Sequence, residues 1–137
     1  ILFTTKSHYM KMIAPITSAM FFILLGCSSS PSNSSVEAYL ESYWSGCNKL
    51  VSISDVNKTN GVPGDREYKV DFSYNLVFKH PISNVFHLRN YCTKQKPADT
   101  LAHVLLRSGA VKEGDSLQMI GTVVLVKSEK GWISNDQ

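Results

Sequence analysis

The sequence predicts an α+β fold: an N-terminal helix packed on a curved antiparallel sheet of about four strands, with a second short helix inserted. Three observations carry this prediction. Apolar residues between positions 36 and 47 recur at helical steps, those between 68 and 78 alternate strictly, and a short polar turn joins two apolar segments near the end of the chain. An amphipathic helix and a sheet with one apolar face each need a partner, and the simplest arrangement lays the helix across the sheet.

The first helix is expected at the start of a single domain that spans residues 36–137. Ser34 lies three residues before Glu37, which is the spacing of a capping box, and Gly46 allows the chain to leave the helix. Steps of three and four place one apolar stripe along this helix, formed by Val36, Tyr39, Leu40, Tyr43, Trp44 and Cys47.

The clearest strand signal begins at Tyr68. A strand over residues 50–59, with a bulge at Asp55, and a turn over residues 60–65 precede it. Every second position then carries an apolar or aromatic residue, with polar residues between them. This alternation predicts a long strand with one buried face, formed by Tyr68, Val70, Phe72, Tyr74, Leu76 and Phe78.

The second half of the chain completes the sheet. Residues 85–92 predict a short strand or an irregular segment, and residues 100–108 predict a helix that closes at Gly109. Residues 117–127 are apolar on both faces, which is typical of a central strand, and a tight turn leads to the last strand at Trp132. This order of elements resembles cystatin-like or nuclear-transport-factor-like rolls. The ending Val-Lys-x-x-x-Gly-Trp-Ile within residues 121–133 resembles their terminal hairpin.

The aromatic residues of the helix and the long strand are expected to form the core, and a ligand- or partner-binding face is the alternative. The inward side of the strand offers phenols but neither carboxylate nor imidazole, which disfavours an enzyme that uses the concave face of the roll. The candidate face consists of Tyr39, Tyr43, Trp44, Tyr68, Phe72 and Tyr74.

An apolar run over residues 12–25 follows Lys11 and ends in Leu-Leu-Gly-Cys at positions 24–27. It is shorter than the ~20 residues that span a bilayer and fits the ~7–15 apolar residues of a signal peptide. The four residues resemble a bacterial lipobox, in which the cysteine is acylated and the chain is cleaved before it. An ordinary secretory signal or an uncleaved anchor is the alternative.

The lipobox resemblance implies a signal peptide over residues 1–26, with its start at Met10, followed by a lipidated Cys27 and a serine-rich tether over residues 27–35. Acyl chains such as palmitate would hold the protein on a membrane of the cell envelope. Ser28 stands where an aspartate commonly retains lipoproteins in the inner membrane, so the resemblance implies the outer membrane, facing the periplasm.

Cys47 and Cys92 are the two cysteines that remain, and in an oxidising compartment they are expected to form a disulfide. A catalytic cysteine with His87 or His103 as its base is the alternative. Asp99 lies four residues before His103, so the two would meet on one face of a helix.

No cofactor or metal is expected, because the glycines form no phosphate-binding motif and the histidines lack the spacing of a metal site. The charge balance of 14 Lys and Arg against 11 Asp and Glu gives no reason to expect nucleic acid binding. We therefore expect a non-enzymatic, lipid-anchored envelope protein that binds or assembles with another envelope protein. One alternative is an inhibitor or immunity-type lipoprotein that blocks a cell-wall hydrolase with residues 60–65 or 81–91, and an enzyme of the same fold is the other.

Overall fold

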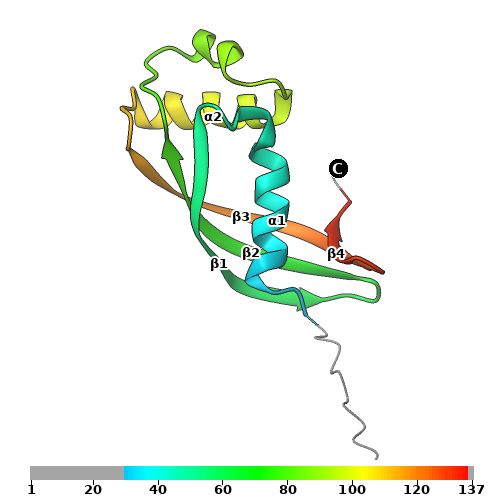
Figure 1. Ribbon diagram of the computed structural model, residues 1–137. Helices are drawn as coiled ribbons and strands as arrows, with labels where there is room; N and C mark the ends of the chain where they lie inside the picture. The colour runs from blue at the N-terminus through cyan, green and yellow to red at the C-terminus, as the bar shows by residue number, and fades with distance from the viewer. Residues whose placement is uncertain (1–29, 136–137) are drawn as a thin grey trace, which may run out of the picture.

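Four antiparallel strands form one open sheet, and helix α1 crosses one face of it (Figure 1). The computed structural model describes residues 30–135. The strands follow the order β1-β2-β3-β4 in the sheet, so the predicted α+β fold, with one helix on a four-stranded antiparallel sheet and a second short helix, is confirmed. Along the chain, the elements are α1 (Asn33–Trp44), the 3-10 helix η1 (Ser45–Cys47), β1 (Val51–Pro63), β2 (Glu67–Phe78), the 3-10 helix η2 (Val85–Asn90), α2 (Gln95–Ser108), β3 (Ser116–Ser128) and β4 (Gly131–Ser134).

The start of α1 differs from the prediction. The helix begins at Asn33, ahead of the expected domain boundary at residue 36, and the side chain of Pro31 is already fully buried. The predicted capping box is wrong, because Ser32 holds the N-cap position and no side chain caps the helix. Lys58 of β1 fixes this segment: its backbone N–H donates to Asn33 Oδ1 at 2.8 Å, and its Nζ donates to the Pro31 carbonyl at 3.0 Å.

The predicted bulge in β1 is confirmed. Asp55 has a φ of 53°, and the register with β2 shifts between Ser54 and Asn57 and again before Asn60. An extra residue in one strand of an antiparallel pair bends that strand and increases its twist. The strand continues through most of the predicted turn, so the connection to β2 shortens to residues 64–66.

The core lies between α1 and the inner face of the sheet, as the alternation in β2 predicts. The Trp44 indole of α1 donates to the Tyr74 hydroxyl at 3.1 Å. Phe72 lies over Gly121 of β3, where an added Cβ would come within 2.7 Å of the ring, so the aromatic ring occupies the space that a side chain would take. The buried residues of β2 are Val70, Phe72, Tyr74, Leu76 and Phe78, and Tyr68 is half-buried.

Two elements of the second half differ from expectation. Residues 85–90 form the 3-10 helix η2 instead of a strand, and the Asn84 side chain accepts from the Phe86 N–H at its start. Helix α2 begins at Gln95, earlier than predicted, with Pro97 in its first turn, where a missing N–H is tolerated.

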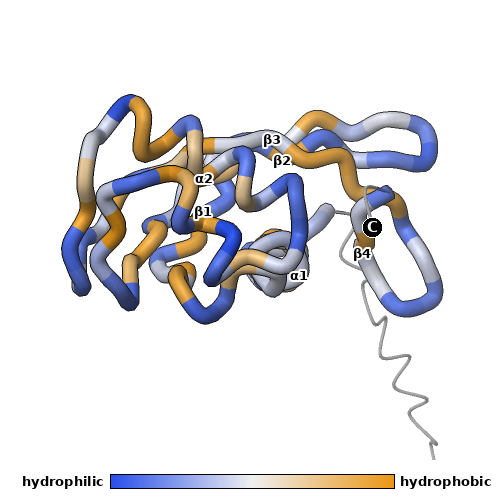
Figure 2. The backbone as a smooth tube through the Cα atoms, turned by 90° about the horizontal axis from the view of Figure 1, so that it is seen from above, coloured by the Kyte–Doolittle hydropathy of each residue, from blue (hydrophilic) through white to orange (hydrophobic). Residues whose placement is uncertain are grey.

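Strand β3 lies between β2 and β4, as its apolar composition predicts, but its outer face is open: Ile120 is 84 % exposed. The turns that join β1 to β2 and β3 to β4 lie at the same end of the sheet, because Glu67 pairs with Val126. Both turns are polar in Figure 2. Helix α2 lies at the opposite end of the molecule from the point where the chain enters α1 (Figure 1).

Candidate functional site

The six aromatic residues of the predicted face do not share one surface. Trp44, Phe72 and Tyr74 are buried, with exposed fractions of 3 %, 4 % and 6 %, and belong to the core. Tyr39 and Tyr43 are half-buried on the side of α1 that meets the start of α2. The sixth residue, Tyr68, packs edge-on against Trp132 of β4.

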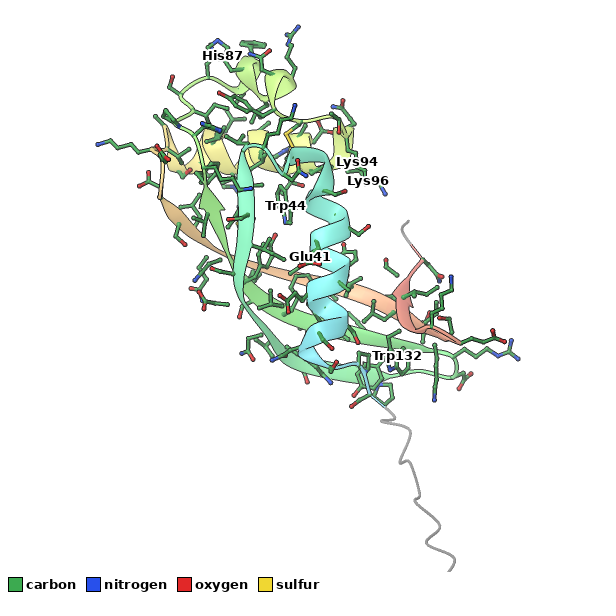
Figure 3. The ribbon with its side chains drawn as sticks, viewed as in Figure 1. Glu41, Trp44, His87, Lys94, Lys96 and Trp132 are labelled. Atoms are coloured by element: carbon green, nitrogen blue, oxygen red, sulfur yellow. A yellow bond between two sulfur atoms is a disulfide. The ribbon has the colours of Figure 1, made fainter. Side chains whose placement is uncertain are left out.

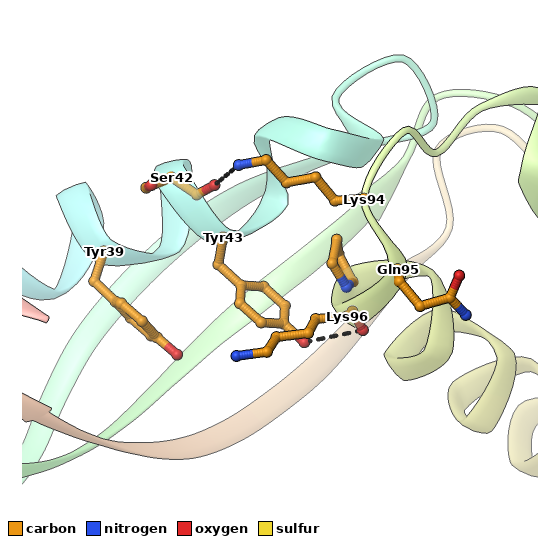
Figure 4. A pocket seen from close by; sticks show the side chains of 7 residues that line it. Tyr39, Ser42, Tyr43, Lys94, Gln95 and Lys96 are labelled. Carbon is orange, nitrogen blue, oxygen red and sulfur yellow. Dashed lines mark hydrogen bonds between the residues drawn. The ribbon is translucent and has the colours of Figure 1, made fainter. Parts of the chain in front are cut away.

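A pocket of about 430 Å³ lies between α1 and the start of α2 (Figure 4). We call it the tyrosine pocket, because Tyr39 and Tyr43, one helical turn apart, form its wall on α1. The segment that leads into α2 forms the opposite wall. The residues that line the pocket are Tyr39, Ser42, Tyr43, Lys94, Gln95, Lys96 and Pro97.

The opposite wall is held in place by contacts with the end of α1. The Lys94 Nζ donates to the Ser42 carbonyl at 3.3 Å and to Ser45 Oγ at 3.0 Å. The Thr93 N–H donates to the Gly46 carbonyl at 2.6 Å. Position 46 has to be glycine for this close approach, because a Cβ there would come within 2.5 Å of the Lys94 side chain.

The predicted disulfide between Cys47 and Cys92 is present, with an S–S distance of 2.08 Å. It joins η1 to the chain just before Lys94, so it holds the two walls of the pocket together covalently. Both sulfur atoms are bonded, so neither cysteine offers the thiolate that the catalytic alternative requires.

The polar side chains of the pocket carry two phenols, the Ser42 hydroxyl, the Gln95 amide and two ammonium groups. The Tyr43 hydroxyl lies 2.6 Å from Thr100 Oγ1 and donates to the Lys96 carbonyl at 3.3 Å. The Lys96 side chain extends beside the Tyr43 ring in Figure 4, and its ammonium group is exposed. Among the described residues that line the pocket there is no carboxylate and no imidazole. The pocket therefore combines aromatic walls with positive charge.

Tyr74 is the described group with a clearly shifted pKa. Burial raises its pKa from 10.0 to about 12, and the hydrogen bond from Trp44 opposes the rise. Its hydroxyl lies beneath α1 in the core and does not line the tyrosine pocket. The shift therefore has its cause in packing.

The three histidines within residues 30–135, His80, His87 and His103, do not assemble into a catalytic or metal site. His103 Nδ1 lies 2.8 Å from the backbone carbonyl of Asp99, while the Asp99 carboxylate accepts from Gln95 Nε2 at 2.6 Å. The predicted carboxylate–imidazole pair is therefore wrong. His80 stacks on Tyr91, and in Figure 3 His87 lies on η2, away from the lysines of the pocket. Within residues 30–135, no group of three or more His, Cys, Asp or Glu side chains is arranged to hold a metal ion.

Sequence reasoning found the tyrosines of the pocket but missed Lys94, Gln95, Lys96 and Pro97. The second helix was expected to start at residue 100 with Pro97 just before it, so Lys94, Gln95 and Lys96 had no assigned position, whereas α2 begins at Gln95. The expected disulfide could have indicated where these residues lie. A bond from Cys47 to Cys92 forces the residues that follow Cys92 to lie against the end of the first helix.

The candidate lipidation residue, Cys27, lies outside the described residues. No helix within residues 30–135 has the length and apolar character needed to cross a membrane. Comparison of the chain with protein-family models, curated proteins and solved structures gives no match.

Proposed function

We propose that this protein is a lipid-anchored, non-enzymatic binding protein of the bacterial cell envelope, and that it holds a segment of another envelope protein in the tyrosine pocket. The observation that carries the proposal is the pocket itself: two tyrosines and two lysines around a cavity whose walls a disulfide joins. Binding sites are concave, largely apolar and furnished with a few polar groups, and cavities of ~300–1,000 Å³ are typical of them.

The chemistry of the pocket favours a segment with an apolar or aromatic side chain next to a carboxylate. Tyrosine rings offer a large, rigid contact area together with a hydroxyl, which suits them to interfaces. Lys96 supplies the cation that would pair with the carboxylate. The start of α2 adds to this charge, because no side chain caps its first amides and a helix N-terminus carries a partial positive charge.

The anchor in this proposal is Cys27, acylated after cleavage of residues 1–26, with the domain held at the outer membrane and facing the periplasm. The support is the resemblance of residues 24–27 to a lipobox. The disulfide agrees with an oxidising compartment, since such bonds persist outside the cytosol. The helix-on-sheet architecture agrees with the roll-like folds that the order of elements resembles.

An inhibitor of a cell-wall hydrolase is the second candidate, and one observation favours it. Phe86, at the start of η2, is 69 % exposed. In Figure 1, η2 projects at the end of the molecule opposite the point where the chain enters α1. An exposed aromatic residue on a projecting loop is the kind of group that anchors an interface in a partner's pocket.

A charge-reversal experiment separates the two candidates. Tagged protein is purified from solubilised envelopes of cells that express the wild type, Lys96→Glu, Phe86→Ser or the matched control Lys112→Glu. Lys112 is an exposed lysine in the connection between α2 and β3. We expect the wild type and Lys112→Glu to retain the same partner and Lys96→Glu to lose it by about tenfold or more, which corresponds to ~1.4 kcal/mol.

Two results contradict the pocket as the binding site. The first is equal recovery of the partner with Lys96→Glu and Lys112→Glu. The second is loss of the partner in Phe86→Ser alone, which would favour the inhibitor. Recovery of no partner above the empty-tag control would contradict a binding role.

A further inference from the structure

The length of chain between Cys27 and the folded domain limits how far the domain can lie from the membrane. Pro31 is fully buried, and its carbonyl accepts from Lys58 Nζ at 3.0 Å. Four Cα–Cα steps separate Cys27 from Pro31, and each step covers at most ~3.8 Å, so the anchor lies within about 15 Å of Pro31. A flexible spacer over residues 27–35, as expected from the serine content, would reach farther.

The surface next to Pro31 carries a lysine and two aromatic residues, and all three are half-buried. The Lys58 Nζ that binds the Pro31 carbonyl also lies 5.0 Å from the centre of the Tyr68 ring. Tyr68 in turn contacts Trp132 edge-on, with 5.8 Å between ring centres. In Figure 3, Trp132 lies close to the point where the chain enters α1. We refer to Lys58, Tyr68 and Trp132 as the membrane-proximal cluster.

We propose that the membrane-proximal cluster rests on the lipid headgroups and sets the orientation of the domain on the bilayer. This inference rests on the proposed lipid anchor at Cys27. Tryptophan and tyrosine favour the membrane–water interface because one part of each ring system is apolar and the other forms hydrogen bonds with water. Lysine suits the same depth, since its aliphatic stem contacts apolar groups while the ammonium group meets lipid phosphates.

The other face of the sheet adds exposed apolar residues at the same end. Val62 near the end of β1 is 55 % exposed and Ile133 of β4 is 45 % exposed, and the strand register places both on the outer face, opposite Tyr68 and Trp132. This end of the sheet carries exposed charges of both signs, with Arg66 and Lys130 beside Asp65, Glu67 and Glu129. The exposed apolar residues are therefore the part of this surface that a headgroup region accommodates, and the charges form no positive patch.

This orientation has a consequence for the tyrosine pocket. Helix α1 leads away from Pro31, and its 12 residues cover about 18 Å at 1.5 Å per residue. Tyr43 and the first turn of α2 lie toward the far end of α1 (Figure 1). The membrane-proximal cluster on the bilayer therefore places the pocket on the side of the domain that faces the periplasm, where a partner can reach it.

Tryptophan quenching tests the proposal with the lipidated protein. The protein is reconstituted into vesicles of phosphatidylethanolamine and phosphatidylglycerol in which some headgroups carry a nitroxide, which quenches nearby tryptophan fluorescence. The chain has two tryptophans, and Trp44 is 3 % exposed in the core. We expect the wild type to lose about a third or more of its emission and Trp132→Phe, which retains only Trp44, to lose almost none.

A second variant tests whether the short tether is what brings Trp132 close to the headgroups. Inserting about ten Gly and Ser residues between Ser30 and Pro31 releases the domain from the surface, so quenching of Trp132 falls although the anchor is intact. Flotation of the vesicles in a density gradient reports on the anchor independently. Protein that fails to float contradicts the lipid anchor and, with it, this inference. Protein that floats with equal, weak quenching in the wild type and Trp132→Phe contradicts the orientation alone.

Discussion

Phe72 shows at the scale of single residues how the alternating pattern determines which side chains form the core. It is 4 % exposed, contacts Tyr39 edge-on and covers Gly121, whereas Lys69 on the same strand is exposed. We expect Phe72→Ala to lower the free energy of unfolding by ~3–5 kcal/mol and Lys69→Ala to change it by less than ~0.5 kcal/mol. Urea denaturation of both variants measures the difference. Equal effects at the two positions would show that β2 does not have one buried face and one exposed face.

Tyr74 makes stability depend on pH in the alkaline range. Its folded-state pKa of about 12 lies above the ordinary value of 10.0, so folding favours the neutral phenol. The stabilisation is therefore complete below pH 10 and is lost as the pH rises through about 12, with a size of about 3 kcal/mol.

Tyr74→Phe tests this dependence. The variant should be less stable than the wild type by ~1–3 kcal/mol at pH 8, because the Trp44 N–H loses its acceptor, and should lose less stability between pH 10 and 12. Denaturation curves at several pH values give both quantities. An alkaline loss as steep in the variant as in the wild type would assign the pH dependence to other groups.

The residues of the candidate face show where one-dimensional patterns stop being informative. Helical periodicity places Tyr39, Tyr43 and Trp44 on one side of α1 and no more than that. The packing of α1 on the sheet decides that Trp44 lies against Tyr74 of β2 in the core, and the position of α2 decides that the two tyrosines line a pocket. The spacing of apolar residues in α1 therefore does not indicate which of them α2 will contact.

At the scale of elements, the disulfide determines how α2 meets α1. Opening the bond by Cys47→Ser with Cys92→Ser removes a cross-link over a sequence separation of 45 residues, which in the chain-entropy model costs about 4 kcal/mol. We expect the double variant to unfold at lower denaturant concentration. We also expect intact-mass analysis of the unreduced wild type to show two hydrogens fewer than the reduced form. Two freely alkylated thiols in the native protein would contradict the pairing.

The elements with strong periodicity were predicted well, and those controlled by local polar contacts were not. The alternation in β2 and the turn before β4 lie where the sequence indicates. The start of α1 was missed because Lys58, far along the chain, binds Pro31 and Asn33 and so extends the folded region. The start of α2 was missed because the disulfide and the contacts of Lys94 determine where the chain turns into that helix.

At the scale of the whole molecule, the proposed anchor and the proposed binding site lie toward opposite ends of the domain. Pro31 and the membrane-proximal cluster lie at one end, close to the proposed anchor, and the tyrosine pocket lies toward the other, beside α2 (Figure 1). The α+β fold itself could be predicted from two periodic segments and one hairpin. The relation between the two ends could not, because it depends on contacts between residues far apart in the sequence.

Lipidation of Cys27 is the premise on which the placement of this protein depends, and the mass of the mature N-terminus tests it most directly. Protein purified from the membrane fraction of bacterial cells should begin at Cys27 and carry the added mass of a diacylglyceryl group with its acyl chains. Cys27→Ser should lack that mass and either leave the membrane fraction or remain as an uncleaved precursor. A Cys27→Ser protein that is cleaved, acylated and fractionated like the wild type would contradict the account.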